Sequence, residues 1–127
     1  MTAIRRILFQ FARTRLAGAF IRLGFAYMSF AIPVQRLRET SSLLAFYHPS
    51  PSYPVHILLV PKRAYRSLMD IPKGNETFLS DVVETVQDLV RSLRLEEGGY
   101  RLIANGGSFQ DVPLLHFHLV AGKETGG

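Results

Sequence analysis

The sequence predicts an α+β domain in which one long helix packs against a mostly antiparallel sheet. An amphipathic stripe over residues 76–95 follows the three-and-four spacing of a helix, and several short apolar runs are bounded by proline and glycine, as strands are. The 127 residues are 47% hydrophobic and 20% charged, which is typical of one folded domain. The chain has no cysteine, so disulfides and thiolate chemistry are excluded.

A basic apolar arm, residues 1–31, is predicted to precede a domain formed by residues 32–127, with Pro33 marking the end of the arm because proline disfavours helix in the residue before it. Residues 1–38 hold seven arginines and no acid, whereas residues 39–127 hold eight lysines and arginines against ten acidic residues. The net charge of +5 therefore comes from the arm rather than from the domain. No nucleic-acid partner is expected from it.

The arm is predicted to be a helix that lies on an anionic membrane surface, because it is apolar, rich in arginine and free of acids. Arg22 interrupts the apolar window 16–32, which makes a membrane span unfavourable. A targeting presequence, or a helix that packs on the domain or a second subunit, are the alternatives. The expected location is cytoplasmic, at the inner membrane surface, with organellar targeting left open.

The domain's first elements are bounded by turn-forming residues. Residues 42–47 predict a short strand, and a loop with three prolines then leads to a buried strand over residues 56–60. Residues 65–69 predict one or two helical turns that end near Pro72.

The clearest element is the helix over residues 76–95. Its stripe consists of eight apolar residues: Phe78, Leu79, Val82, Val83, Val86, Leu89, Val90 and Leu93. Gly98 and Gly99 are predicted to stop the helix by supplying a left-handed cap. Residues 100–104 predict another strand, and the glycine loop 105–108 leads to a last apolar run that contains two histidines.

All four histidines fall in two short segments. His116 and His118 flank Phe117, so on a strand they point to the same face, while His48 and His56 enclose the proline-rich loop. Such imidazoles suit attack on phosphorus by one ring while another neutralises the phosphate oxygens. They equally suit a zinc site, or hydrogen-bonded polar positions without chemistry. Spacing alone leaves these three roles open.

Two segments together resemble the histidine-triad (HIT) family. Residues 110–122 resemble its signature, in which histidine and a hydrophobic residue alternate three times before a short apolar–glycine stretch. Residues 32–62 are similar to the opening of its nucleoside phosphoramidase branch, at Phe46, Ser50-Pro51, Pro54, His56 and Val60-Pro61-Lys62 among others. The resemblance covers residues 32–122. It implies a HIT-like antiparallel sheet with one long packed helix, preceded here by the basic apolar N-terminal helix.

The resemblance implies a nucleotide-binding hydrolase or transferase, of the nucleoside phosphoramidase or dinucleoside polyphosphate hydrolase type. Such enzymes work through a covalent His-nucleotidyl intermediate, without a cofactor and without a metal in the chemical step. It implies His116 as the nucleophile, with His118 and His56 at the same phosphate. The implied nucleotide-binding residues are Phe46, His48, Leu58, Asn105, Gln110, Asp111 and Val112. The expected partners are a small-molecule nucleotide and a second copy of the chain, in a homodimer.

Three positions depart from the family pattern. Leu114 stands where the first histidine of the triad is expected, and strand alternation predicts it beside the nucleophile as an aliphatic wall. His48 replaces the acid that usually holds the ribose hydroxyls, and Asp111 replaces the serine that assists the leaving group. Two other functions therefore remain as alternatives to the metal-free enzyme. One is a degenerate nucleotide- or phosphate-binding module without turnover, and the other is a metal enzyme whose ligands are His56, His116 and His118.

Overall fold

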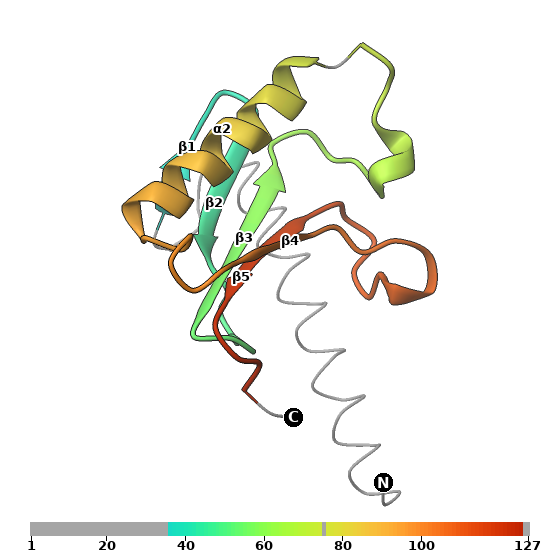
Figure 1. Cartoon of the computed structure of the whole chain (residues 1–127). Helices are drawn as coiled ribbons and strands as arrows, with labels where there is room; N and C mark the ends of the chain where they lie inside the picture. Colours follow the sequence, from blue (N-terminus) through green and yellow to red (C-terminus); the bar gives the residue numbers. More distant parts are fainter. Residues whose placement is uncertain (1–35, 75, 126–127) are drawn as a thin grey trace, which may run out of the picture.

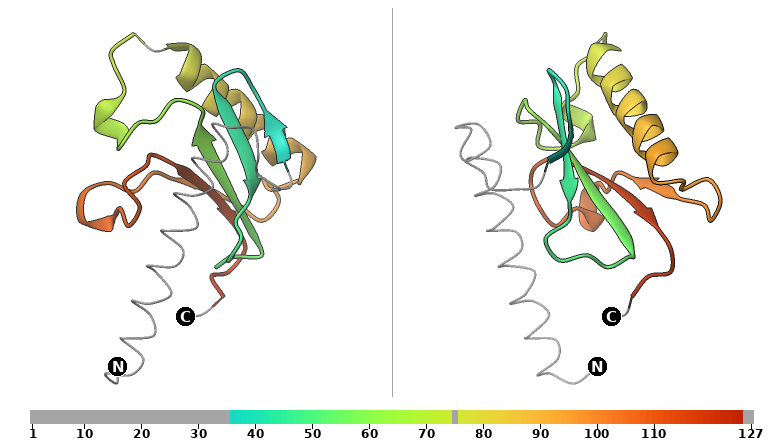
Figure 2. Two further views of the ribbon diagram at one scale, coloured as in Figure 1. Left: turned by 180° about the vertical axis from the view of Figure 1, so that it is seen from behind. Right: turned by 90° about the vertical axis from the view of Figure 1, so that its left-hand side faces the viewer.

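The computed structural model describes residues 36–74 and 76–125. In this part of the chain five strands form one antiparallel sheet in the order β1-β2-β3-β5-β4. The strands are β1 (Arg36–Glu39), β2 (Leu43–Tyr47), β3 (Val55–Pro61), β4 (Arg101–Ile103) and β5 (Phe117–Ala121). The helix α2 (Glu76–Ser92) lies across one face of the sheet (Figures 1 and 2). The predicted α+β class is confirmed, and the arm, residues 1–31, lies outside the described residues.

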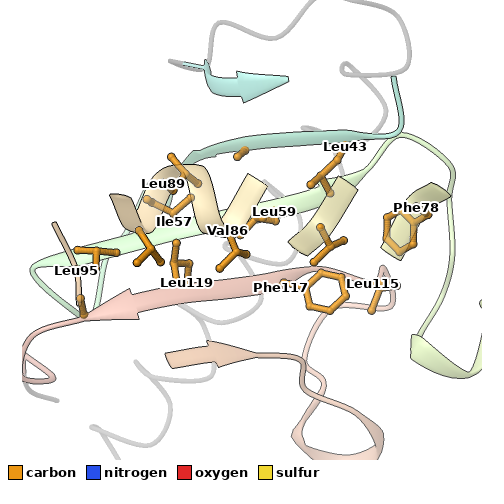
Figure 3. Packing of buried hydrophobic residues seen from close by; sticks show 14 of the residues in the cluster. Leu43, Ile57, Leu59, Phe78, Val86, Leu89, Leu95, Leu115, Phe117 and Leu119 are labelled. Atoms are coloured by element: carbon orange, nitrogen blue, oxygen red, sulfur yellow. The ribbon is translucent and has the colours of Figure 1, made fainter. Parts of the chain in front are cut away.

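The core lies between α2 and the sheet face that it covers (Figure 3). Because side chains alternate along a strand, every second residue of the central strands enters this core. The strand residues are Leu43, Ala45, Ile57, Leu59, Phe117, Leu119 and Ala121, and α2 contributes Phe78, Val82, Val86, Leu89 and Val90. The residues between them on β2, β3 and β5 therefore point to the opposite face.

The end of α2 differs from the prediction. Of the two predicted glycines, Gly99 has a φ of +89° but lies seven residues beyond the end of α2, and the left-handed residue that ends the helix is Arg94, with φ of 55°. Its N–H donates to the carbonyl of Arg91 at 3.2 Å, and the N–H of Leu95 donates to Val90 at 2.9 Å. These are the two bonds of a Schellman motif, in which the apolar residue after the left-handed one packs back on the helix. Leu95 is buried, and this burial stabilises the motif without a glycine.

Other boundaries also shift. The helical turns predicted for residues 65–69 are a single 3₁₀ turn, η1 (Leu68–Asp70), and β1 was not predicted. Leu79 and Val83, assigned to the apolar stripe, are 47% and 53% exposed. Among the described residues, no helix has the length and apolar character that crossing a membrane requires.

Candidate active site

Three histidines share the sheet face opposite α2. His118 on β5 pairs with Leu58 of β3, and His56 on β3 pairs with Val120 of β5. His48 follows β2 directly, and its N–H donates to the carbonyl of His56 at 2.8 Å, which continues the pairing of β2 with β3. The sheet register therefore brings together side chains that lie up to 70 positions apart in the sequence.

The fourth histidine completes one cluster of rings. The ring centroids lie 4.3 Å apart for His48 and His56, 5.1 Å for His56 and His118, and 4.9 Å for His116 and His118. His116 precedes the first residue of β5, so it reaches the cluster from the segment that enters the strand. The expected meeting of His56, His116 and His118 is present in the structure, and His48 joins it.

Hydrogen bonds assign the ring protons of His56 and His118. The N–H of Ser52 donates to Nδ1 of His56 at 3.0 Å, so the proton of the neutral His56 ring is on Nε2. This Nε2 lies 2.9 Å from Nδ1 of His118 and donates to it. The proton of His118 is therefore on its own Nε2.

The main chain also orders the other two rings. Nδ1–H of His116 donates to the carbonyl of Leu114 at 2.7 Å, which leaves the ring lone pair on Nε2. The N–H of Ser50 donates to Nδ1 of His48 at 2.9 Å, so His48 carries its proton on Nε2. The cluster thus combines one ring with a nucleophilic Nε2 lone pair and three rings with Nε2–H donors.

Burial keeps all four rings neutral near pH 7. Burial first, and the neighbouring imidazoles second, lower the pKa of His118 to about 3 and that of His48 to about 4. Burial also lowers the pKa of His56 and of His116, although the Leu114 carbonyl and the Asp111 charge act in the opposite direction on His116. A neutral His116 is the form that can attack an electrophile.

The lowered pKa values predict loss of stability in acid. Each histidine of the unfolded chain takes up a proton near pH ~6.5, whereas the folded cluster resists protonation, so acid favours the unfolded chain. The stabilisation is present above the ordinary pKa and is lost as the pH falls towards the folded values, with a slope of up to ~1.4 kcal/mol per pH unit for each histidine that stays neutral. Urea unfolding between about pH 7 and pH 5 measures it. His48→Gln should reduce the slope, and a free energy of unfolding that does not change with pH would contradict the prediction.

Leu114 does not have the predicted position. It lies in a bend before β5, not on a strand, because the N–H of Leu115 donates to the carbonyl of Tyr65 at 2.8 Å instead of joining the sheet. The alternation argument that placed the Leu114 side chain as a wall beside His116 therefore does not apply. The main-chain carbonyl of Leu114 accepts the hydrogen bond from Nδ1–H of His116 and so fixes the orientation of that ring. That contact needs no histidine at position 114.

Five residues predicted to bind the nucleotide lie in three places: on the histidine face of the sheet, just beyond β4, and in the segment before β5. Phe46 and Leu58 are paired across β2 and β3 and are buried on the histidine face, in line with His118. Asn105 lies two residues beyond β4, at the end of the sheet where β5 begins. Val112 is buried. Gln110 donates through Nε2 to the carbonyls of Arg66 and Val112, at 2.6 and 2.9 Å, so its amide also ties two loops together.

A metal site has no support in this geometry. Within residues 36–74 and 76–125, no three histidine, aspartate or glutamate side chains are arranged to hold a metal ion. The physical reason lies in the hydrogen bonds, because both nitrogens of His56 and Nδ1 of His118 are already engaged.

The sequence reasoning missed the groups that orient the rings, because these are main-chain groups. Ser50 follows His48 by two residues, a spacing at which a side chain often bonds a nearby N–H, and this was the available signal. The contact of Tyr53 with His56 was not predicted either; the two rings meet edge-on with centroids 5.5 Å apart.

A glycine holds the proline-rich loop in place. Gly122 follows β5 with φ of +85°, and a Cβ there would lie 2.7 Å from Cγ of Pro54. Only glycine tolerates both that conformation and that approach. The N–H of Thr125 then donates to the carbonyl of Ser52 at 2.7 Å, which fixes the residue that orients His56.

Comparison with known proteins agrees with this geometry. The HIT domain family model matches residues 29–125. A HIT-like protein of Azospirillum brasilense is 36% identical over 98 residues, covering 75% of this chain and 80% of the relative. An adenosine 5′-monophosphoramidase of Candida albicans is 33% identical over 101 residues, covering 73% and 64%. A histidine triad protein from Clostridium difficile superposes with a TM-score of 0.70 at 34% identity, covering 80% and 90%. The chain belongs to the HIT domain family.

Proposed function

We propose that the chain is a nucleotide-binding hydrolase or transferase in which His116 forms a covalent nucleotidyl intermediate. The observation that carries the proposal is the single Nε2 lone pair of His116 among the Nε2–H donors of the cluster. One group can attack phosphorus while the others stabilise its oxygens. Similarity to a monophosphoramidase supports a nucleoside phosphoramidate as substrate, with a dinucleoside polyphosphate as the second candidate.

The chemical steps balance as two displacements at phosphorus. Nε2 of His116 attacks, an Nε2–P bond forms, the P–N bond to the leaving amine breaks, and the amine takes a proton from water. Nε2–H of His118 donates to a non-bridging phosphate oxygen during this step. A second water molecule then attacks the same phosphorus and gives its proton to the hydroxide that remained when the amine was protonated. The Nε2–P bond breaks, and a nucleoside monophosphate is released with His116 neutral again.

Leu114 and Asp111 act on the charge of the intermediate. A phosphorylated His116 ring is cationic, and its Nδ1–H already donates to the carbonyl of Leu114. The Asp111 carboxylate favours positive charge on this ring, because its charge acts to raise the pKa of His116. The same carboxylate repels an anionic phosphate. Asp111 therefore stabilises the cationic intermediate but does not strengthen binding of the substrate.

An assay with a fluorogenic adenosine phosphoramidate and with diadenosine polyphosphates tests the proposal, with and without a chelator. We expect the same turnover rate with and without the chelator. After rapid acid quench, mass spectrometry should find a nucleotidyl group attached to His116. Nucleotide binding without turnover would favour the degenerate binding module. Turnover lost on chelation would overturn the metal-free chemistry.

We further propose a homodimer. Leu79 and Val83 are exposed apolar residues on α2, and Leu102 is 42% exposed on β4, which is an edge strand of the sheet. Exposed apolar residues and an open strand edge favour pairing with a second copy. A Leu79→Glu/Val83→Glu variant should sediment as a monomer, whereas Glu84→Lys, which also changes the charge by two but on an exposed part of the helix turned away from Leu79 and Val83, should not. An unchanged sedimentation coefficient in the double variant would contradict a helix-mediated dimer.

We propose, from the sequence, that residues 1–31 bind an anionic membrane surface on the cytoplasmic side. The seven arginines of residues 1–38 meet no acid in that segment. The fraction of the full chain that co-sediments with anionic liposomes should therefore fall as the salt concentration rises, because salt screens the attraction between the arginines and the anionic lipids. Replacing the five arginines of residues 1–22 by glutamine should remove the binding. Equal binding by that variant would refute the role of the arm.

A further inference from the structure

Two ring N–H groups of the histidine cluster have no hydrogen-bond acceptor among the residues that the structure describes. One is Nε2–H of His118, which the proposed chemistry assigns to the reacting phosphate. The other is Nε2–H of His48, a half-buried side chain whose ring lies 4.3 Å from that of His56. A ring N–H that bonds no protein group is available to a ligand, so an atom that accepts a hydrogen bond is favoured beside His48.

The cluster distinguishes between the acceptors that could lie there. Nδ1 of His48, of His56 and of His118 each already accepts a hydrogen bond. A sugar hydroxyl beside His48 would need an acceptor for its own proton, and neither His48 nor His56 can provide one. An anionic oxygen needs only donors and makes the stronger, charge-assisted bond. The surroundings of His48 therefore favour an anion over a hydroxyl.

The ring of His48 is separate from that of His118, so two different acceptors can lie at the two donors. The two rings are stacked at 23° with centroids 6.2 Å apart, and the ring of His56 contacts both. Phosphates on two hydroxyls of one sugar are held apart by the sugar itself, so each can accept from one of these two rings.

We propose that His48 forms a second oxyanion subsite, and that the preferred ligand is a nucleoside bisphosphate type, with a phosphate ester at the 2′ or 3′ position besides the 5′ phosphate. The inference rests on the proposed function in one respect, because it takes the reacting phosphate to lie at His116 and His118. It adds the class of nucleotide that the site selects.

Calorimetric titration of the full chain tests the subsite with adenosine 5′-monophosphate and the 3′,5′- and 2′,5′-bisphosphates. One bisphosphate should bind at least about tenfold more tightly than the monophosphate, which corresponds to ~1.4 kcal/mol. His48→Asp should abolish or reverse this preference, because a carboxylate repels the added phosphate and accepts from hydroxyls. His48→Gln keeps an N–H donor and should retain part of it. Arg91→Gln, on exposed α2, removes one cation and should leave the preference unchanged.

Equal affinity of the wild-type chain for monophosphate and bisphosphates would overturn the proposal, and so would an unchanged preference in His48→Asp. Nitrogen-15 NMR of the wild-type imidazoles gives a check without any variant, since the bisphosphate must shift the Nε2 signal of His48 more than the monophosphate does. Titration measures binding without turnover. A chain that shows the preference but cleaves no phosphoramidate would refute the proposed hydrolysis and leave the subsite standing.

Discussion

Replacing His116 by alanine is expected to abolish cleavage of an adenosine phosphoramidate, with a loss in kcat of about 10⁴-fold or more. The variant removes the only Nε2 lone pair of the cluster and leaves the three Nε2–H donors in place. Nucleotide binding should therefore persist while the nucleotidyl adduct disappears. Steady-state kinetics, calorimetry and intact-protein mass after acid quench measure the three effects.

A second variant separates the missing nucleophile from a disturbed site. His116→Gly leaves a space that added imidazole can enter, so imidazole should restore part of the turnover in this variant but not in the wild-type chain. His118→Gln keeps the nucleophile and should lose less turnover than His116→Ala. Residual activity of His116→Ala within tenfold of wild type would mean that another group attacks the phosphorus.

Leu119→Ala is expected to cost about 2–5 kcal/mol of the free energy of unfolding. Leu119 is fully buried on β5 between its strand neighbours Ile57 and Leu102, and it faces α2 in the core (Figure 3). Truncation leaves a cavity that the surrounding rigid strands cannot close. Since a domain of this kind has only about 5–15 kcal/mol of stability, the loss is a large fraction of the total.

The matched control is Met69→Ala, because Met69 is 87% exposed on η1 and its truncation opens no cavity. Its effect should stay within about 0.5 kcal/mol. Urea unfolding followed by circular dichroism compares the two variants at one pH. Similar midpoints for Leu119→Ala and wild type would show that β5 does not anchor the core.

The elements that could be predicted are those whose apolar residues recur at the positions that are buried in the core. The apolar periodicity of α2 and the apolar runs of β2 and β3 come from contact with one core, so they appear in the sequence. β1 was missed because Leu37 is its only apolar residue, and an edge strand needs no more. The start of β5 was misplaced because residues 114–119 form an apolar run broken only by His116 and His118, while the hydrogen bond from Leu115 to Tyr65 that delays the strand leaves no pattern.

The identity of the site residues could be predicted from the family resemblance, and the structure brings all four histidines together. What the sequence does not contain is the state of each ring. The assignment of a nucleophile among four similar side chains depends on the carbonyl of Leu114 and on the N–H groups of Ser50 and Ser52. Every residue type except proline carries both kinds of group, so no side-chain pattern marks them.

Because main-chain groups orient the rings, most mutations of the orienting residues leave the proton positions of the histidine cluster unchanged. The main-chain N–H groups of Ser50 and Ser52 donate to Nδ1 of His48 and of His56, which keeps each ring proton on Nε2. These groups survive nearly every point mutation, and proline is the one replacement that would delete a donor. The proton pattern can therefore be inherited unchanged while the side chains around it drift. Two descendants of one ancestor can differ at Ser50, Ser52 and Leu114 and still present the same lone pair of His116 to a substrate.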